Sequence, residues 1–81
     1  MDLSQVKAAK TVDARSMACP GPLLEAKKGI AGVPVGGILE IQSGDKGSRE
    51  DIPAWCAKSG HEYLGVLERD GYDSLFVTRK K

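Results

Sequence analysis

The sequence predicts an α/β fold of the α+β two-layer sandwich type, with the element order βαβαββ: a four-stranded mixed sheet with two helices packed on one face. Four short segments alternate hydrophobic and polar residues with the two-residue period of strands. Two segments between them carry apolar residues at the three- and four-residue spacing of amphipathic helices. The dipeptide Asp70-Gly71 between the last two alternating segments is a strong hairpin signal.

The first half of the chain is predicted to form a strand, a helix and a second strand. The first strand is expected over Ala9 to Ala14, the helix from Pro20 to about Ala31, and the second strand over Ile38 to Gln42. A strand, helix and strand within so few residues indicate a parallel, right-handed βαβ unit. Residues 1 to about 8 show no period and receive no assignment.

The second half is predicted to form a helix and a hairpin. Ser48 to Asp51 is expected to form a first turn with a start that resembles a capping box, and Ile52 to Ser59 the helix proper, which ends at Gly60. Two strands follow, Glu62 to Glu68 and Tyr72 to Arg79.

The side chains expected to face the core occupy the inward positions of these periods. They are Val12, Ala14, Leu23, Leu24, Ile30, Ala31, Leu39, Ile41, Ile52, Trp55, Cys56, Leu64, Val66, Leu75 and Val77.

Composition limits the classes of function. A chain of 81 residues is expected to form one domain, residues 1–81, and we expect a monomer without a large substrate cavity. A net charge of +1 without clustered arginines argues against direct binding of nucleic acid. No apolar run approaches the length of a membrane span, and the first residues lack an apolar signal core, so we expect a cytoplasmic protein. In that compartment two free thiols are favoured over a Cys19–Cys56 disulfide.

Cys19 is the residue around which the rest of the chain is organised. We expect it at the N-cap of the first helix, with Pro20 at N1, where its fixed φ suits a helix start, and Pro22 at N3. The two prolines make the start of the helix stiff. A cysteine at an exposed helix start is a candidate functional thiol.

The surroundings expected for Cys19 favour a thiolate. The prolines supply no N–H groups, so those of Gly21 and Leu23 are expected to face an anion at Cys19. The helix dipole and the nearby Arg15 would add to this stabilisation. We therefore expect a moderately lowered pKa for the Cys19 thiol.

The other candidate chemistries lack a partner residue. Pro22 stands where a dithiol motif would have its second cysteine, and His61 is distant in sequence and has no reason to act as a base for Cys19. Cys56 is interpreted as a small buried side chain, and no ligand spacing indicates a metal or cofactor. An activated thiol without its own base suits the carriage of a group that other proteins load and remove, and sulfur held as a persulfide is the natural cargo.

The run from Val12 to Leu23, which contains Cys19-Pro20-Gly21-Pro22, resembles the C-P-x-P signature of the TusA/SirA-like sulfur carrier family. The likeness extends over nearly the whole chain from about Lys10, although Ser16 stands where the family usually has glycine. The resemblance implies the two-layer sandwich and a persulfide on Cys19. It also implies a cysteine desulfurase or rhodanese as donor and an acceptor protein, in transfer RNA thiolation, molybdenum cofactor assembly or sulfur oxidation.

Two alternatives of another class remain open: a regulatory protein-interaction module that does not move sulfur, and a thiol that senses oxidants. For partner recognition, Lys27, Lys28, Lys46 and Arg49 could form a basic rim that docks an acidic protein. A solvated face explains each of these cations equally well.

Overall fold

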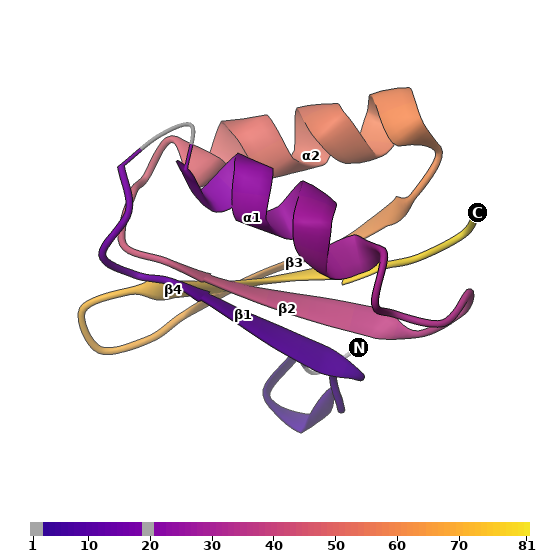
Figure 1. Ribbon diagram of the computed structural model, residues 1–81. Coiled ribbons are helices and arrows are strands. Elements are labelled where there is room, and N and C mark those ends of the chain that lie inside the picture. Colours follow the sequence, from indigo (N-terminus) through magenta and orange to yellow (C-terminus); the bar gives the residue numbers. More distant parts are fainter. Residues whose placement is uncertain (1–2, 19–20) are drawn as a thin grey trace.

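Two helices cover one face of a four-stranded sheet in the computed structural model, which describes residues 3–18 and 21–81 (Figure 1). The order βαβαββ and the mixed sheet predicted from the sequence are confirmed. The elements are η1 (Leu3–Gln5), β1 (Lys10–Ala14), α1 (Gly21–Ile30), β2 (Ile38–Ser43), α2 (Ser48–Ser59), β3 (Glu62–Glu68) and β4 (Asp73–Thr78).

The sheet has the strand order β1-β2-β4-β3. β1 and β2 run parallel, as the βαβ prediction requires, while β4 is antiparallel to both of its neighbours. At one edge Ala14 pairs with Ser43, Ser43 with Asp73, and Asp73 with Glu68. The loops that follow β1 and β2 and the loop that joins β3 to β4 therefore emerge at the same edge of the sheet.

The core lies between the sheet and the helices. The predicted core residues that are buried there are Val12, Ala14, Ile30, Leu39, Ile41, Ile52, Trp55, Cys56, Leu75 and Val77. Leu23 and Val66 are half-buried and pack against this cluster.

The buried face of α1 differs from the prediction. Leu24 is 50% exposed, and Ala31, just past the end of the helix, is exposed as well. The buried positions of the helix are Pro22, Ala26, Gly29 and Ile30. A Cβ placed at Gly29 would lie 2.6 Å from Cγ2 of Val12, so the helix lies against β1 through its small residues. This close approach fixes the rotation of the helix and turns Leu24 outward.

A bulge in β3 overturns the inward position predicted for Leu64. Tyr63 pairs with Val77 and Gly65 with Phe76, so one extra residue is inserted between Tyr63 and Gly65. The bulge moves the alternation by one position, and Tyr63 packs against the core in place of Leu64. Gly65 has φ of 145°, which glycine adopts readily, and a glycine inside a strand is the sequence signal that could have indicated the bulge.

The prediction for the C-terminal end of α2 is confirmed, and the prediction for its N-terminal end is wrong. Gly60 ends the helix as predicted, with φ of 81° and its N–H donating to the carbonyl of Cys56 at 2.9 Å. The capping box is wrong: the N-cap is Gly47, without a side-chain cap bond, and Ser48 is the first helical residue. The Ser48 hydroxyl instead lies 2.8 Å from the hydroxyl of Ser43 in the interior.

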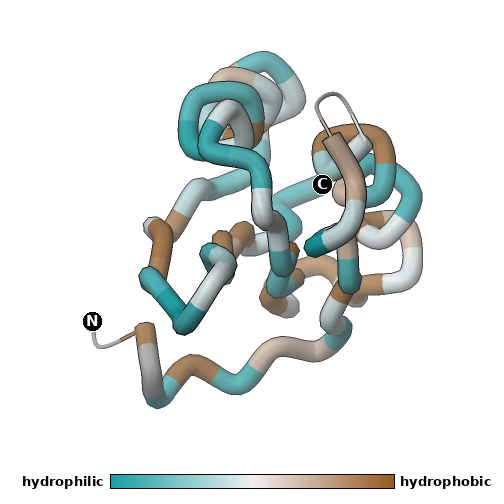
Figure 2. The backbone as a smooth tube through the Cα atoms, turned by 90° about the vertical axis from the view of Figure 1, so that its left-hand side faces the viewer, coloured by the Kyte–Doolittle hydropathy of each residue, from teal (hydrophilic) through white to brown (hydrophobic). Residues whose placement is uncertain are grey.

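The N-terminal segment lies on the other face of the sheet, away from the helices (Figures 1 and 2). The Leu3 side chain lies close to β3: a Cβ placed at Gly65 would be 3.0 Å from Cδ1 of Leu3. The N–H of Ala9 donates to the carbonyl of Ile38 at 2.7 Å, and Phe76 on this face is only 1% exposed. The segment without a predicted element thus helps to cover the second face. No helix in the described part of the chain is long and apolar enough to cross a membrane.

Candidate functional site

The candidate site lies at the sheet edge where three loops meet. Residues 15–18 follow β1, residues 44–47 follow β2, and residues 69–72 join β3 to β4. The first of these loops leads into α1, whose first residue is Gly21. Cys19 and Pro20 fall between, outside the described residues, so the predicted N-cap and N1 roles stay predictions.

The chain on either side of this pair is held by backbone hydrogen bonds. The N–H of Met17 donates to the carbonyl of Ala14 at 3.1 Å, and the N–H of Gly21 donates to the carbonyl of Ala18 at 2.7 Å. The Gly21 N–H, which was expected to face an anion at Cys19, is therefore already bound to the carbonyl of Ala18.

The first turn of α1 is anchored on the core. Pro22 is buried, and Leu23 is half-buried and packs against the core cluster. A Cβ at Gly21 would lie 2.8 Å from the Cβ of Met17, so the loop folds closely over the helix start. These contacts fix the position at which the helix begins, two residues after Cys19.

Arg15 is bound to Asp13 and does not carry an isolated charge. Its Nε and Nη2 donate to the two carboxylate oxygens of Asp13 at 2.9 Å each, and its backbone N–H donates to Oδ1 at 3.2 Å. These hydrogen bonds lower the pKa of Asp13 to about 2. The guanidinium also lies over the ring of Tyr72, with Cζ at 5.2 Å from the ring centroid. An effect of Arg15 on the Cys19 thiolate remains a prediction.

Cys56 has the environment of an inert thiol. It is free, 2% exposed and packed in the core cluster with Trp55. Burial raises its pKa to about 11, so the thiolate is scarce near neutral pH. The interpretation of Cys56 as a small buried side chain is confirmed.

His61 lies beyond the far end of α2 from this edge. The twelve residues of the helix separate it from loop 44–47, a distance of about 18 Å along the axis. Its ring stacks at a tilt on Trp55, with centroids 5.5 Å apart, and Nδ1 accepts a hydrogen bond from the N–H of Lys80 at 3.2 Å. Within residues 3–18 and 21–81, no group of three or more His, Cys, Asp or Glu side chains could hold a metal ion.

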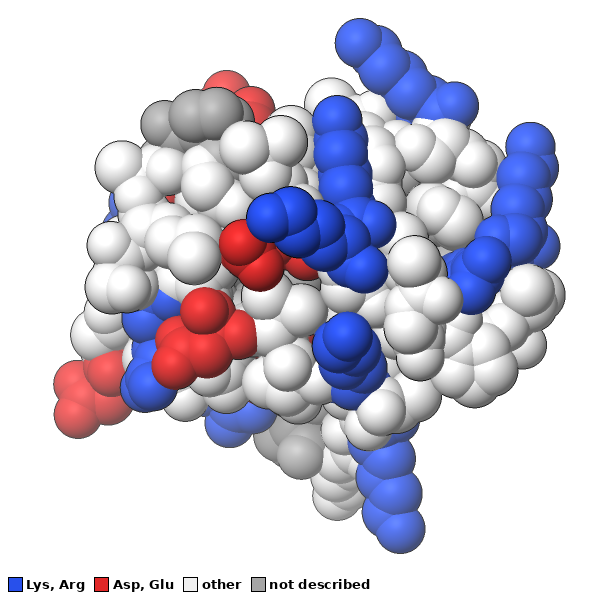
Figure 3. Space-filling view, in the orientation of Figure 1, with Lys and Arg blue, Asp and Glu red and all other residues white. Residues whose placement is uncertain are grey.

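The four cations expected as a basic rim fall into two places. Lys27 and Lys28 are exposed on α1, where Lys27 lines a groove of about 250 Å³ between the helices. The other lining residues of this groove are Leu23, Asp51, Ala54, Trp55 and Lys58. In Figure 3, a side view with the helices above the sheet, basic side chains prevail on the right and acidic ones lie toward the left and centre.

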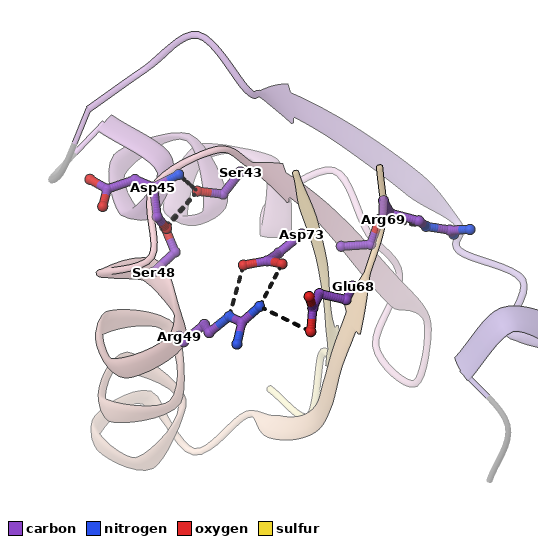
Figure 4. Close-up of polar contacts among 8 residues, drawn as sticks. Ser43, Asp45, Ser48, Arg49, Glu68, Arg69 and Asp73 are labelled. Carbon is purple, nitrogen blue, oxygen red and sulfur yellow. Dashed lines mark hydrogen bonds and ion pairs between the residues drawn. The ribbon is translucent and has the colours of Figure 1, made fainter. Parts of the chain in front are cut away.

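The other two cations lie by the loop edge. Lys46 is exposed and lines a separate hollow of about 260 Å³ with the β3–β4 hairpin. Arg49 turns inward and bonds to Asp73 through two hydrogen bonds of 2.8 Å (Figure 4). The structure therefore does not join the four side chains in one rim.

The residues that sequence reasoning missed are Asp13 and Tyr72. The spacing of Asp13 and Arg15, two apart in a strand that ends there, was a local signal that could have indicated their pairing. Tyr72 had no such signal, because 57 positions separate it from Arg15 and only the sheet topology brings the two together.

Comparisons with known proteins agree with the fold and with the family that the sequence resembles. The family described as sulfurtransferase TusA matches residues 10–79. A protein of Archaeoglobus fulgidus, inferred to be a sulfur carrier, is 43% identical over 70 residues, which cover 86% of this chain and 96% of the relative. The sulfur carrier protein TusA of Pseudomonas entomophila is 38% identical over 71 residues, 88% of each chain.

A solved structure supports the same conclusion. The crystal structure of a SirA-like protein from Desulfitobacterium hafniense superposes with a TM-score of 0.76 at 26% identity, covering 89% of this chain and 99% of the other. The match therefore includes the sheet and both helices. The chain belongs to the TusA sulfurtransferase family, and its role is that of a sulfur carrier.

Proposed function

We propose that the chain carries sulfur as a persulfide on Cys19. The observation that carries the proposal is the state of the other thiol: Cys56 is 2% exposed, and its pKa is raised to about 11. A sulfur carrier needs a thiol that its partners can reach and that ionises near neutral pH. Cys19, which stands two positions before the first residue of α1 in the sequence, is the thiol left for this role.

The transfer is an exchange between thiols. The Cys19 thiolate attacks the outer sulfur of a persulfide on the donor, the donor's S–S bond breaks, and the donor cysteine leaves as a thiolate. Cys19 then holds the persulfide. A thiolate of the acceptor attacks the terminal sulfur, and Cys19 leaves as a thiolate. Each step is a displacement at sulfur, so the carrier needs neither a general base nor a cofactor.

The donor would be a cysteine desulfurase or a rhodanese, and the acceptor a sulfur-relay protein. Transfer RNA thiolation, molybdenum cofactor assembly and sulfur oxidation are the processes that we propose it feeds. Pro20 and Pro22 would keep the start of α1 stiff while the partners exchange sulfur at Cys19.

Partner docking is proposed through exposed cations. Lys27, Lys28 and Lys46 are exposed and can reach an acidic surface, although Nζ of Lys28 also lies 3.8 Å from the carboxylate of Glu25. Arg49 is the weakest of the four original candidates, because its guanidinium already binds Asp73. We further propose that the chain acts as a single-domain monomer in the cytoplasm.

The proposal is tested by a matched pair of variants, Cys19→Ser and Cys56→Ser. Each is incubated with a persulfide-loaded rhodanese or with a cysteine desulfurase and cysteine, and intact mass is measured. Cys19→Ser should remain folded, since serine is a competent N-cap, and should gain no sulfur. Cys56→Ser should lose about 1–3 kcal/mol of stability if the hydroxyl finds no partner, yet should still gain one sulfur.

The other outcomes identify the alternatives. A wild-type protein that gains no sulfur from either donor would indicate an interaction module. Oxygen or mixed-disulfide adducts on Cys19 would indicate a sensor of oxidants. A Cys19→Ser protein that loads Cys56 and passes the sulfur on at the wild-type rate would remove Cys19 from the mechanism.

A further inference from the structure

We propose that Asp13, Arg15 and Tyr72 act as positioning residues for sulfur transfer, holding the segment 15–18 that leads to Cys19 against the β3–β4 hairpin. This inference rests on the role proposed for Cys19. It assigns a function to the hairpin, which supplies no residue to the sulfur chemistry itself.

The contacts form a continuous connection from β1 to the hairpin. Asp13, in β1, binds the Arg15 guanidinium through both carboxylate oxygens and also accepts the backbone N–H of Arg15. The fork geometry fixes the plane of the guanidinium. That plane lies at 5.2 Å from the ring centroid of Tyr72, within the range of a cation–π contact.

The space around segment 15–18 leaves much of the work of holding it to the contact between Arg15 and Tyr72. A hollow of about 380 Å³ lies between the segment and the hairpin, lined by Asp13, Arg15, Ser16, Asp70, Gly71 and Tyr72. Open space therefore lies beside the contact between Arg15 and Tyr72. On the other side the carbonyl oxygen of Arg15 lies so close to Gly44 that a Cβ there would approach it to 2.7 Å. The segment is thus held between loop 44–47 and the hairpin.

Because Asp13 and Arg15 are exposed, their contacts can position the segment locally without being needed for folding. The side chains of Arg15 and Asp13 are 51% and 58% exposed. Exposed pairs contribute little to global stability, because water and salt screen them. Loss of the cluster should therefore loosen the segment before Cys19 while the protein stays folded.

The variant Arg15→Lys distinguishes an effect of the Arg15 charge from an effect of the geometry of its guanidinium. If Arg15 acted only by its positive charge on the Cys19 thiolate, Arg15→Lys would behave as wild type. If it acts through its planar fork, a lysine cannot bind both carboxylate oxygens and stack on Tyr72 in the same way, so the variant should lose the effect.

The experiment compares Tyr72→Leu with Tyr72→Phe, which keeps the aromatic ring. Asp70→Asn is the control, since Asp70 lines the same hollow at the same hairpin. The readouts are the thermal midpoint, amide hydrogen exchange of residues 15–18, and the single-turnover rate of sulfur transfer from a loaded rhodanese. We expect Tyr72→Leu to speed exchange and to slow transfer by about two- to fivefold, the factor that corresponds to an exposed cation–π contact.

Tyr72→Phe and Asp70→Asn should match wild type in all three readouts, and Arg15→Lys should resemble Tyr72→Leu. The inference is overturned if Tyr72→Leu exchanges and transfers at wild-type rates, if Tyr72→Phe loses as much as Tyr72→Leu, or if Arg15→Lys is normal. Hydrogen exchange needs no sulfur donor. Failure of the proposed function, seen as wild-type protein that takes up no sulfur, is therefore distinguishable from failure of this inference.

Discussion

Arg49 in the first turn of α2 and Asp73 at the start of β4 are joined by two hydrogen bonds of 2.8 Å, Nε to Oδ2 and Nη2 to Oδ1 (Figure 4). The Asp73 side chain is 6% exposed, while that of Arg49 is 34% exposed and also lies 3.7 Å from Glu68. This bidentate pair ties the second helix to the sheet edge on which the candidate site lies.

We expect this pair to make stability dependent on pH. The hydrogen bonds from Arg49 lower the pKa of Asp73 below its ordinary value. Between the two pKa values the unfolded chain binds more protons than the folded one, so the stabilisation is complete above about pH 4 and is lost as pH falls through the lowered folded-state value. Urea unfolding of Arg49→Gln between pH 2 and 7 should show lower stability than wild type at pH 7, with the difference shrinking in acid. An equal deficit at every pH would contradict the pairing.

The buried hydrogen bond between Ser43 and Ser48 gives a second prediction. Their hydroxyls are 2.8 Å apart at 0% and 3% exposure, and Ser43 also accepts the N–H of Asp45 at 3.1 Å. Ser48→Ala should cost about 1–3 kcal/mol by leaving the Ser43 hydroxyl with one partner fewer. Ser43→Ala should cost more, since it also removes the bond to Asp45. The free energies of unfolding in urea measure both.

The double variant is the control for this pair. If the two hydroxyls bond to one another, Ser43→Ala with Ser48→Ala should cost less than the sum of the single changes, because neither partner is left unpaired. Strict additivity would show that the bond contributes nothing.

The fold could be predicted from the sequence because its strongest signals are local and agree with one another. The alternation around Val12 and Ile41 and the turn at Asp70-Gly71 each specify an element without reference to the rest of the chain. The errors arose where tertiary packing decides. Leu24 lies outside because α1 approaches β1 through Gly29. Leu64 leaves the core because of a bulge beside Gly65, whose effect on the register is seen only in the strand pairing.

The candidate site was predictable to a smaller extent. The proposal of Cys19 as the functional thiol followed from its prolines and from the lack of a second motif cysteine. The partners of the cations did not follow, because each depends on a distant residue: Arg49 on Asp73, and Arg15 on Tyr72 as well as on its neighbour Asp13. Charge read along a sequence therefore identified the cations but not which of them are already paired.

The close contact of Gly29 with Val12 predicts an unfavourable Gly29→Ala change. Alanine in place of glycine inside a helix normally adds about 0.8–1 kcal/mol of stability. Here the new Cβ would lie 2.6 Å from Cγ2 of Val12 and 3.3 Å from Cδ1 of Leu39. We expect a net loss of about 1–3 kcal/mol, measured by thermal or urea unfolding. Val12→Ala in the same chain removes the clashing methyl and should recover part of this loss; without any recovery, the contact is not the cause.

The tilted ring contact of His61 with Trp55 predicts a pH-dependent fluorescence signal from the single tryptophan of the chain. Burial, with the charges of Arg79 and Lys81, lowers the pKa of His61. Its Nδ1 accepts the N–H of Lys80, a bond that is lost when Nδ1 takes up a proton. Because the neutral ring is favoured in the fold, this contribution to stability is complete above the ordinary histidine pKa of about 6.5 and declines as pH falls through it to the lower folded value.

We therefore expect Trp55 emission to titrate with a midpoint below about 6.5, since an imidazolium beside an indole changes its quantum yield and a neutral imidazole does so less. Stability measured by urea unfolding should decline over the same range. His61→Gln removes the titrating group and serves as the control: its emission should stay flat between pH 5 and 8. A transition that persists in His61→Gln would assign the titration to another group. A midpoint above 6.5 in the wild type would mean that burial and the charges of Arg79 and Lys81 do not lower the pKa of His61.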